Sequence, residues 1–255
     1  MRKEEMKKEI MRVVVLFSGN ASSLKYLLET SPNINQSYKI VGAFTDRKDA
    51  PGIKLVKGAG IKLKYLDYRD WCRNQKTKIT NLRTRRKYFN DVSQLIKLFK
   101  ADIIMLSGFM LIITNPLLEE YKYRILNVHP ADLTILDSYG KRKYVGKNVV
   151  AKVIKDGVNK ICSTIHIITR DVDGGPILFT SCSIPISTKD SPAEIQEKMK
   201  LECDGPVYDK SLHFLATSKI KFWNLLISKR VPQYWLKEHS NLQCGNLIKR
   251  ILTSF

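Results

Sequence analysis

Short apolar runs alternate with segments of helical periodicity through the first half of the chain. Residues 12–17 read Arg-Val-Val-Val-Leu-Phe, an almost continuous β-branched run of the kind found in strands that are buried on both faces. Comparable runs at 39–45, 61–66 and 101–106 predict three further strands. Apolar positions three and four residues apart at 88–99 predict a long amphipathic helix. This alternation predicts an α/β fold with a doubly wound, mostly parallel sheet.

The remaining elements follow from weaker patterns. Shorter helical patterns at 24–28 and 53–56 connect the first three strands. In the second half of the chain, apolar runs at 124–128, 163–169 and 177–184 predict three more strands. The last two of these runs are separated by an Asp-Gly-Gly-Pro turn.

Two helices are predicted in the second half. One covers 149–154, and the other starts after Ser191, which is followed by Pro192 and then by Glu194. A serine cap, a proline at the first helical position and a glutamate that reaches back form a strong helix start. We expect this helix to continue to residue 201 or beyond.

The chain is expected to form one main domain at 11–217, with an N-terminal extension at 1–10 and a basic C-terminal tail at 218–255 that packs on the domain or extends from it. Its 255 residues are enough to form a hydrophobic core that is stable without disulfides or structural metal ions. The five cysteines lack Cys-x-x-Cys spacing, which indicates reduced thiols in the cytoplasm and no zinc site. No apolar run approaches the ~20 residues of a membrane span, and the charged start does not resemble a secretory signal.

The formal net charge of +20 allows two interpretations. A nucleic-acid-binding surface is one. However, the lysines are spread over most segments, and no aromatic stripe alternates with the two densest basic clusters, at 83–87 and 141–143. We therefore expect nucleic acid to be disfavoured as a partner. A positive field also helps to capture small substrates that carry phosphate or carboxylate groups.

Three side chains with complementary chemistry lie where extended runs give way to loops. Asn127 and His129 are two residues apart at the end of a predicted strand, so both point to the side where open α/β sheets bind ligands. Asp173 precedes two glycines and a proline, and the resulting turn holds its carboxylate. An amide, an imidazole and a carboxylate suit acyl transfer, in which an oxyanion is stabilised while a proton moves. A structural histidine and a turn-forming aspartate are the alternative interpretations, and His166, among apolar neighbours, is interpreted as structural.

The loop after the first strand, residues 18–23, reads Ser-Gly-Asn-Ala-Ser-Ser and opens the first helix. Small residues there expose N–H groups at the positive end of a helix dipole, which suits a phosphate. The loop lacks the further glycines of the Walker and dinucleotide-binding motifs. A capped turn without a ligand is the alternative.

Five motifs occur in a specific order and spacing. They are V-V-V-L-F-S-G-N-A-S-S-L-K-Y-L at 13–27, L-S-G-F-M at 106–110, L-N-V-H-P at 126–130, S-T-I-H-I-I-T-R-D-V-D-G-G-P-I-L at 163–178, and D-S-P-A-E-I at 190–195 followed by Glu202. From about residue 12 to about 206, this set resembles the phosphoribosylglycinamide formyltransferase family of purine biosynthesis. The first motif favours that branch over relatives that act on methionyl-tRNA or nucleotide sugars. The resemblance implies a formyltransferase fold with an added helical or irregular C-terminal tail.

The resemblance also implies the chemistry. The amine of glycinamide ribonucleotide would attack the formyl carbon of 10-formyltetrahydrofolate, a co-substrate, without a metal. Asn127 and protonated His129 would stabilise the oxyanion, and Asp173 would raise the pKa of His129 and organise water. The residues implied to bind the acceptor are Gly19, Asn20, Ala21, Ser22, Ser23, Gly108, Met199, Lys200, Leu201 and Glu202. The residues implied to bind the folate are Arg85, Met110, Leu111, Ile112, Ile113, Asn127, Thr169, Arg170, Asp171, Val172 and Asp173.

Several positions depart from the family pattern. Leu111 replaces a usual arginine, and residues 131–134 read Ala-Asp-Leu-Thr in place of Ser-Leu-Leu-Pro. The next loop is longer, with a basic segment at 140–146, and Asn148 stands where a histidine is common. Asn127, His129 and Asp173 are retained, whereas the loop at 131–148, next to the expected acceptor site, departs from the family pattern. Other amine acceptors such as amino sugars or nucleotide sugars, hydrolysis of the formyl-folate, and RNA binding on the same scaffold therefore stay as alternatives, and a homodimer is left open.

Overall fold

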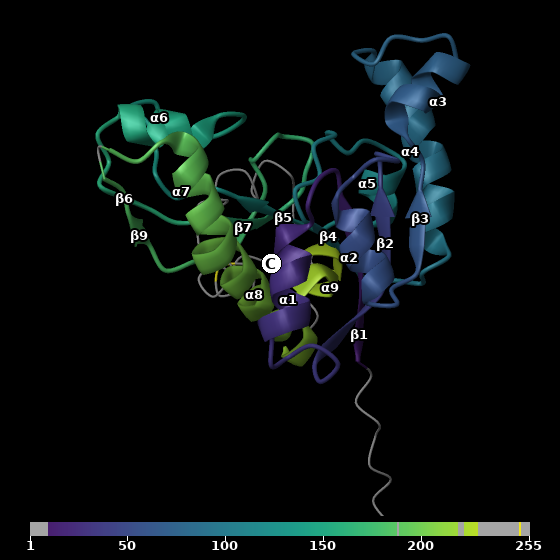
Figure 1. The fold of residues 1–255 in the computed structure, drawn as a ribbon, viewed down its shortest axis with the longest axis horizontal. Coiled ribbons are helices and arrows are strands. Elements are labelled where there is room, and N and C mark those ends of the chain that lie inside the picture. The colour runs from purple at the N-terminus through teal and green to yellow at the C-terminus, as the bar shows by residue number, and fades with distance from the viewer. Residues whose placement is uncertain (1–9, 188, 219–221, 229–249, 251–255) are drawn as a thin grey trace, which may run out of the picture.

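In a computed structural model of the protein, seven strands form one mixed sheet with helices on both faces (Figure 1). The structure describes residues 10–187, 189–218, 222–228 and 250. In spatial order, the strands are β3 (Leu63–Tyr65), β2 (Tyr38–Thr45), β1 (Met11–Phe17), β4 (Ile103–Leu106), β5 (Ile125–His129), β7 (Thr164–Ile167) and β8 (Ile177–Thr180). The strands from β3 to β5 are parallel, whereas β7 is antiparallel to β5 and β8 is antiparallel to β7. The predicted fold class is confirmed.

Alternate residues of β1 belong to two separate cores, one on each face of the sheet. The helices described are α1 (Ser22–Thr30), α2 (Gly52–Gly58), α3 (Tyr68–Asn74), α4 (Leu82–Lys97), α5 (Leu117–Glu120), α6 (Val149–Lys155), α7 (Pro192–Met199), α8 (Gly205–Thr217) and α9 (Phe222–Ser228). Val13, Val15 and Phe17 pack with α1, α2, α8 and α9, whereas Val14 and Leu16 pack with α3, α4 and α5. All five side chains are fully buried, as the apolar run at 12–17 predicts.

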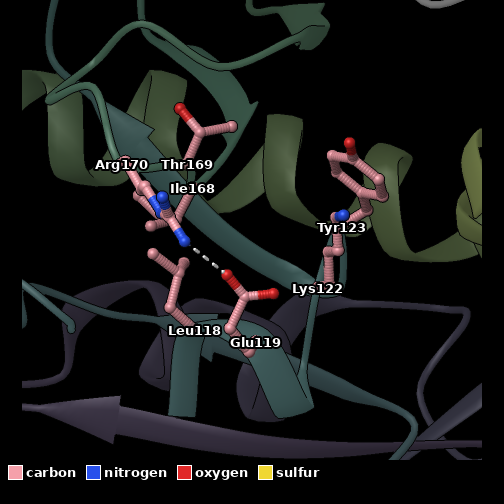
Figure 2. Close-up of a pocket in the computed structure, with 7 residues that line it drawn as sticks. All are labelled: Leu118, Glu119, Lys122, Tyr123, Ile168, Thr169 and Arg170. Carbon is pink, nitrogen blue, oxygen red and sulfur yellow. Dashed lines mark hydrogen bonds and ion pairs between the residues drawn. The ribbon is translucent and has the colours of Figure 1, made fainter. Parts of the chain in front are cut away.

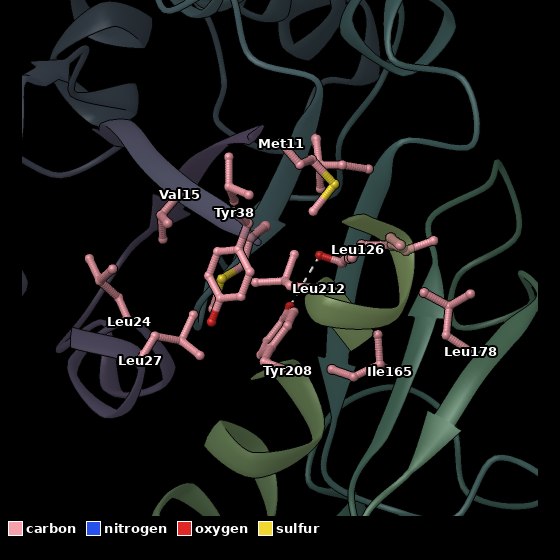
Figure 3. Close-up of a cluster of buried hydrophobic side chains, with 14 of the residues drawn as sticks. Met11, Val15, Leu24, Leu27, Tyr38, Leu126, Ile165, Leu178, Tyr208 and Leu212 are labelled. Atoms are coloured by element: carbon pink, nitrogen blue, oxygen red, sulfur yellow. Dashed lines mark hydrogen bonds between the residues drawn. The ribbon is translucent and has the colours of Figure 1, made fainter. Parts of the chain in front are cut away.

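Helix α8 connects the first of these cores to the ends of two central strands (Figure 3). Its Tyr208 is fully buried beside Leu212 and the leucines of α1. The Tyr208 hydroxyl is hydrogen-bonded to the carbonyl oxygens of Leu106 at 2.5 Å and Leu126 at 3.2 Å. Since these residues end β4 and precede Asn127 on β5, α8 supports the sheet directly behind the predicted site.

A third core lies under α6 and α7, and it changes one predicted strand. The predicted strand at 177–184 is wrong in its extent: β8 ends at Thr180, and Ile184 belongs to β9 (Ile184–Pro185), which pairs with β6 (Lys160–Ile161) in a separate two-stranded sheet. The small polar residues 181–183 separate the two strands, and Ile184 is buried against α6 and α7 rather than in the main sheet.

The predicted helix start at Ser191 is confirmed. The Ser191 hydroxyl accepts the N–H of Glu194 at 3.3 Å, and the Glu194 carboxylate accepts the N–H of Ser191 at 2.8 Å. Helix α7 then continues through a π-helical segment, η1 (Lys200–Asp204), into α8.

Most of the predicted extension at 1–10 and of the tail at 218–255 lies outside the described residues. Within the tail, α9 buries Leu225 and Leu226 against the core that contains α1 and α8. This part of the tail therefore packs on the domain. Across the described ranges, no helix has the length and apolar character needed to cross a bilayer.

Candidate active site

The loops that follow β1 and β4 meet at the topological switch point of the sheet, because the chain leaves these neighbouring strands in opposite directions. Open α/β sheets bind ligands at such a point. Ser18 joins the loops: its N–H donates to Gly108 O at 3.1 Å, and its hydroxyl accepts the Met110 N–H at 2.9 Å. The same hydroxyl donates to the carboxylate of Asp46, after β2, at 2.6 Å. Burial raises the pKa of Asp46.

A cleft of about 500 Å³ opens over these loops. Its lining includes predicted acceptor-site residues and three cations: Gly19, Asn20, Ala21, Ser22, Gly108, Arg47, Arg69 and Lys200. Helix α1, which the structure describes in full, has no acidic residue in its first turn, and its N-cap residue Ala21 forms no side-chain cap. The Ser107 hydroxyl accepts the N–H of Leu24 at 3.3 Å, which leaves the N–H groups of Ser22 and Ser23 for a ligand. Its first N–H groups and dipole therefore favour an anion at this end of the cleft.

The antiparallel pairing of β5 with β7 places Asn127 directly opposite His166. The Asn127 Nδ2 lies 3.2 Å from His166 Nε2, and His166 Nδ1 lies 3.2 Å from Ile167 O. A ring nitrogen that bonds a carbonyl must carry the hydrogen, so His166 donates through Nδ1 and accepts the amide N–H at Nε2. Burial lowers the pKa of His166, which keeps this ring neutral.

Asp173 joins this pair to His129. Its Oδ1 lies 3.5 Å from His166 Nε2, and its Oδ2 lies 3.6 Å from His129 Nδ1 and accepts the Gly146 N–H at 2.8 Å. The other nitrogen of His129, Nε2, donates to Tyr144 O at 2.8 Å. The three predicted catalytic residues thus lie in one cluster with His166. Asn127 is partly exposed, whereas His129 and Asp173 are only 4% and 8% exposed.

The pKa of His129 differs from the expectation. Asp173 and the Tyr144 carbonyl do raise it, but burial of the ring outweighs both, and the net pKa of His129 lies below its usual value of 6.5. The ring is nevertheless held between two acceptors that only the imidazolium form satisfies together. A negative charge that develops nearby would therefore favour protonation.

The predicted folate residues border two different cavities. Met110 and Leu111 line the cleft at the switch point. Thr169 and Arg170 line a smaller cavity of about 150 Å³, which Arg170 spans by pairing with Glu119 at 2.9 Å (Figure 2). The other residues that line this cavity are Leu118, Lys122, Tyr123 and Ile168.

Eleven predicted binding residues border neither described cavity: Ser23, Arg85, Ile112, Ile113, Asn127, Asp171, Val172, Asp173, Met199, Leu201 and Glu202. Met199 is fully buried in the third core, whereas Leu201 and Glu202 are exposed on η1. Arg85 lies near the start of α4, and its buried Nε has no hydrogen-bond partner among the described residues. Their roles stay predictions.

The sequence analysis did not identify three groups in the cluster. His166 was interpreted as structural, although its strand is the one that pairs with Asn127. Arg142 and Tyr144 lie in the basic loop, where nothing in the local sequence distinguishes them from surface residues. Over the part of the chain that the structure describes, no group of histidine, cysteine and acidic side chains could hold a metal ion.

Comparison with known proteins agrees with this arrangement. Residues 11–204 match the sequence model of the formyl transferase family. Phosphoribosylglycinamide formyltransferase from Escherichia coli is 24% identical over 83% of this chain and 90% of its own length. The human trifunctional purine biosynthetic protein adenosine-3 is 24% identical over 91% of this chain, which spans about a fifth of that protein.

Solved structures share the fold. The crystal structure of glycinamide ribonucleotide transformylase 1 from Geobacillus kaustophilus superposes with a TM-score of 0.67 at 19% identity, over 82% of this chain and all of that one. The family match covers the strands, the switch-point loops and the whole cluster around Asp173. The predicted family is therefore confirmed, and the chain belongs to the formyl transferase family.

Proposed function

We propose that the protein transfers the formyl group of 10-formyltetrahydrofolate to the amine of glycinamide ribonucleotide. The observation that carries this proposal is the amide–imidazole–carboxylate cluster of Asn127, His129, His166 and Asp173 at the end of β5. It lies on the strand next to the switch-point strand β4, whose loop lines the cleft. The named relatives that share the family support this choice of acceptor.

In this reaction, the amine nitrogen bonds to the formyl carbon while the carbonyl oxygen becomes an oxyanion. Asn127 donates one amide N–H to His166, and its second N–H is the donor for the oxyanion. His129, between Asp173 and the Tyr144 carbonyl, takes up the proton that the attacking amine loses as this charge develops. The bond from the formyl carbon to N10 of the folate then breaks, and the same proton passes from His129 to N10.

The binding residues follow the same logic. The phosphate of the acceptor binds the first N–H groups of α1 at Ser22 and Ser23, within the field of Arg47 and Lys200. The folate lies along residues 110–113, with its pteridine against the backbone of 169–173.

A steady-state assay on the purified full chain with 10-formyltetrahydrofolate tests the proposal. We expect turnover with glycinamide ribonucleotide that falls by about 10²–10⁴-fold in Asn127→Ala. A matched control, Asn90→Ala, changes an exposed amide on α4 and should keep full turnover. No turnover with glycinamide ribonucleotide in the unsubstituted chain would contradict the proposal.

A second candidate function is motivated by the loop between β5 and α6, which is rebuilt next to the cluster. Turnover with an amino sugar or a nucleotide-linked amine, and none with glycinamide ribonucleotide, would favour it. Formate release without an acceptor would indicate hydrolysis, and salt-sensitive RNA binding without formyl transfer would indicate an RNA-binding protein. The cytoplasmic location and the homodimer stay predictions.

A further inference from the structure

The loop that departs from the family pattern forms a small hairpin, residues 135–146. Leu136 and Arg142 pair as an antiparallel bridge, and the N–H of Lys143 donates to Ile135 O at 2.9 Å. The Asp137 carboxylate accepts backbone N–H groups of the turn and closes it. The hairpin is therefore an ordered element with its own hydrogen bonds.

Alternate residues of this hairpin contact the catalytic groups. The Arg142 guanidinium donates to the carbonyl oxygens of Asp173 and of Gly175, the latter at 2.9 Å. The Tyr144 carbonyl accepts from His129, and the Gly146 N–H donates to the Asp173 carboxylate. Arg142 reaches the cluster with its side chain, whereas Tyr144 and Gly146 reach it with backbone groups.

The turn that carries Asp173 is in a conformation that needs support. The backbone of Asp173 has a φ of +51°, in the left-handed region that residues other than glycine seldom adopt. Gly175 approaches the backbone so closely that a Cβ there would lie 1.8 Å from Ile167 O. A planar guanidinium with two parallel N–H groups is suited to hold two neighbouring carbonyls at once.

We propose that Arg142 is a positioning residue for formyl transfer: its guanidinium fixes the turn at 173–175 and so holds the Asp173 carboxylate against His129 and His166. A test of this role by turnover rests on the proposed function, because it uses the proposed acceptor. The position of the carboxylate can be measured without turnover, through the amide of Gly146 that bonds it.

Arg142 also contributes to the electrostatics of the cluster. The charged and titratable groups that act on His129 are Asp173 from the β7–β8 turn, His166 from β7 and Arg142 from the hairpin. The cationic Arg142 lowers the pKa of His129, against the effect of Asp173. Removal of the Arg142 charge should therefore raise the pKa of His129.

Three substitutions separate the geometry from the charge. Arg142→Lys keeps the charge and loses the planar pair of donors, Arg142→Met removes both, and Arg142→Ala leaves room for added methylguanidine. Lys141→Met is the matched control, because Lys141 is an exposed cation on the same hairpin. Amide exchange of Gly146 and the histidine titrations are measured by NMR on the full chain, which has only four histidines, and kcat is measured with glycinamide ribonucleotide.

We expect kcat to fall about 100-fold in Arg142→Met and in Arg142→Lys, with a KM for the acceptor that changes little. Gly146 exchange should accelerate in both, and the pKa of His129 should rise in Arg142→Met and Arg142→Ala but not in Arg142→Lys. Methylguanidine should restore part of kcat in Arg142→Ala. Unchanged Gly146 exchange in the folded Arg142→Lys and Arg142→Met variants would overturn the proposal, even if the unsubstituted chain formylates another acceptor. A kcat within twofold of the unsubstituted chain would also overturn it, as would equal effects in Lys141→Met.

Discussion

Replacement of Asp173 by asparagine removes one charge from the centre of the cluster with almost no change in volume. The Oδ1 of the new amide can still accept the Gly146 N–H, so the turn keeps that hydrogen bond. What is lost is the attraction between the carboxylate and an imidazolium at His129, 3.6 Å away.

That distance sets the size of the effect. Coulomb's law at 3.6 Å with an effective dielectric constant of about 20 gives about 4–5 kcal/mol. At 1.36 kcal/mol per factor of ten in an equilibrium constant, this attraction corresponds to about 10³-fold. The pKa of His129, already lowered by burial, would fall further, and the imidazolium would become about 10³-fold rarer at neutral pH. We therefore expect kcat to fall by about 10³-fold, within the usual range for acid–base assistance.

The assay is the steady-state rate of folate product formation, with urea unfolding to show that Asp173→Asn folds. Asp91→Asn is the matched control, since this exposed carboxylate on α4 bonds Trp71 and lies outside the cluster. A rate for Asp173→Asn within about threefold of the unsubstituted chain would refute the assigned role of the carboxylate and the dielectric reasoning behind it.

Three further predictions concern stability. Tyr208→Phe should lower the free energy of unfolding by about 1–3 kcal/mol, measured by urea, because the buried carbonyls of Leu106 and Leu126 lose the hydroxyl that bonds them. Asp204→Asn should stabilise the chain at pH 7 by up to about 3 kcal/mol: burial raises the pKa of Asp204 from 3.8 to about 6, so stability is lost as pH rises through that range. The gain should shrink at about pH 5, and a pH-independent gain would contradict this cause. Ser18→Ala should cost about 2–3 kcal/mol and weaken the binding of a folate analogue, and an unchanged midpoint would argue against the bridging role of its hydroxyl.

The sequence predicts those features whose cause is local. The buried strand β1, the amphipathic α4 and the capped start of α7 each follow from neighbouring residues, and the structure confirms them. The contact of His166 with Asn127 was not predicted, because it depends on the antiparallel pairing of two strands that are distant in the chain, β5 and β7. The implied residues 199–202 span the junction of α7 and the π-helical η1, where Met199 at the end of α7 is buried and Lys200 at the start of η1 lines the cleft, a division that local sequence does not show. Arg142 has no sequence signal, since its partners are backbone carbonyls.

The cross-strand pairing of Asn127 with His166 has a consequence for divergence and for protein engineering. The amide is placed by the hydrogen-bond ladder of the sheet, so neighbouring loops can change length without displacing it. A one-residue slip between β5 and β7 would instead turn His166 to the opposite face. Loop grafting onto this sheet would therefore keep the amide of Asn127 in place, whereas a graft that replaces the hairpin at 135–146 must also restore its contacts with His129 and Asp173.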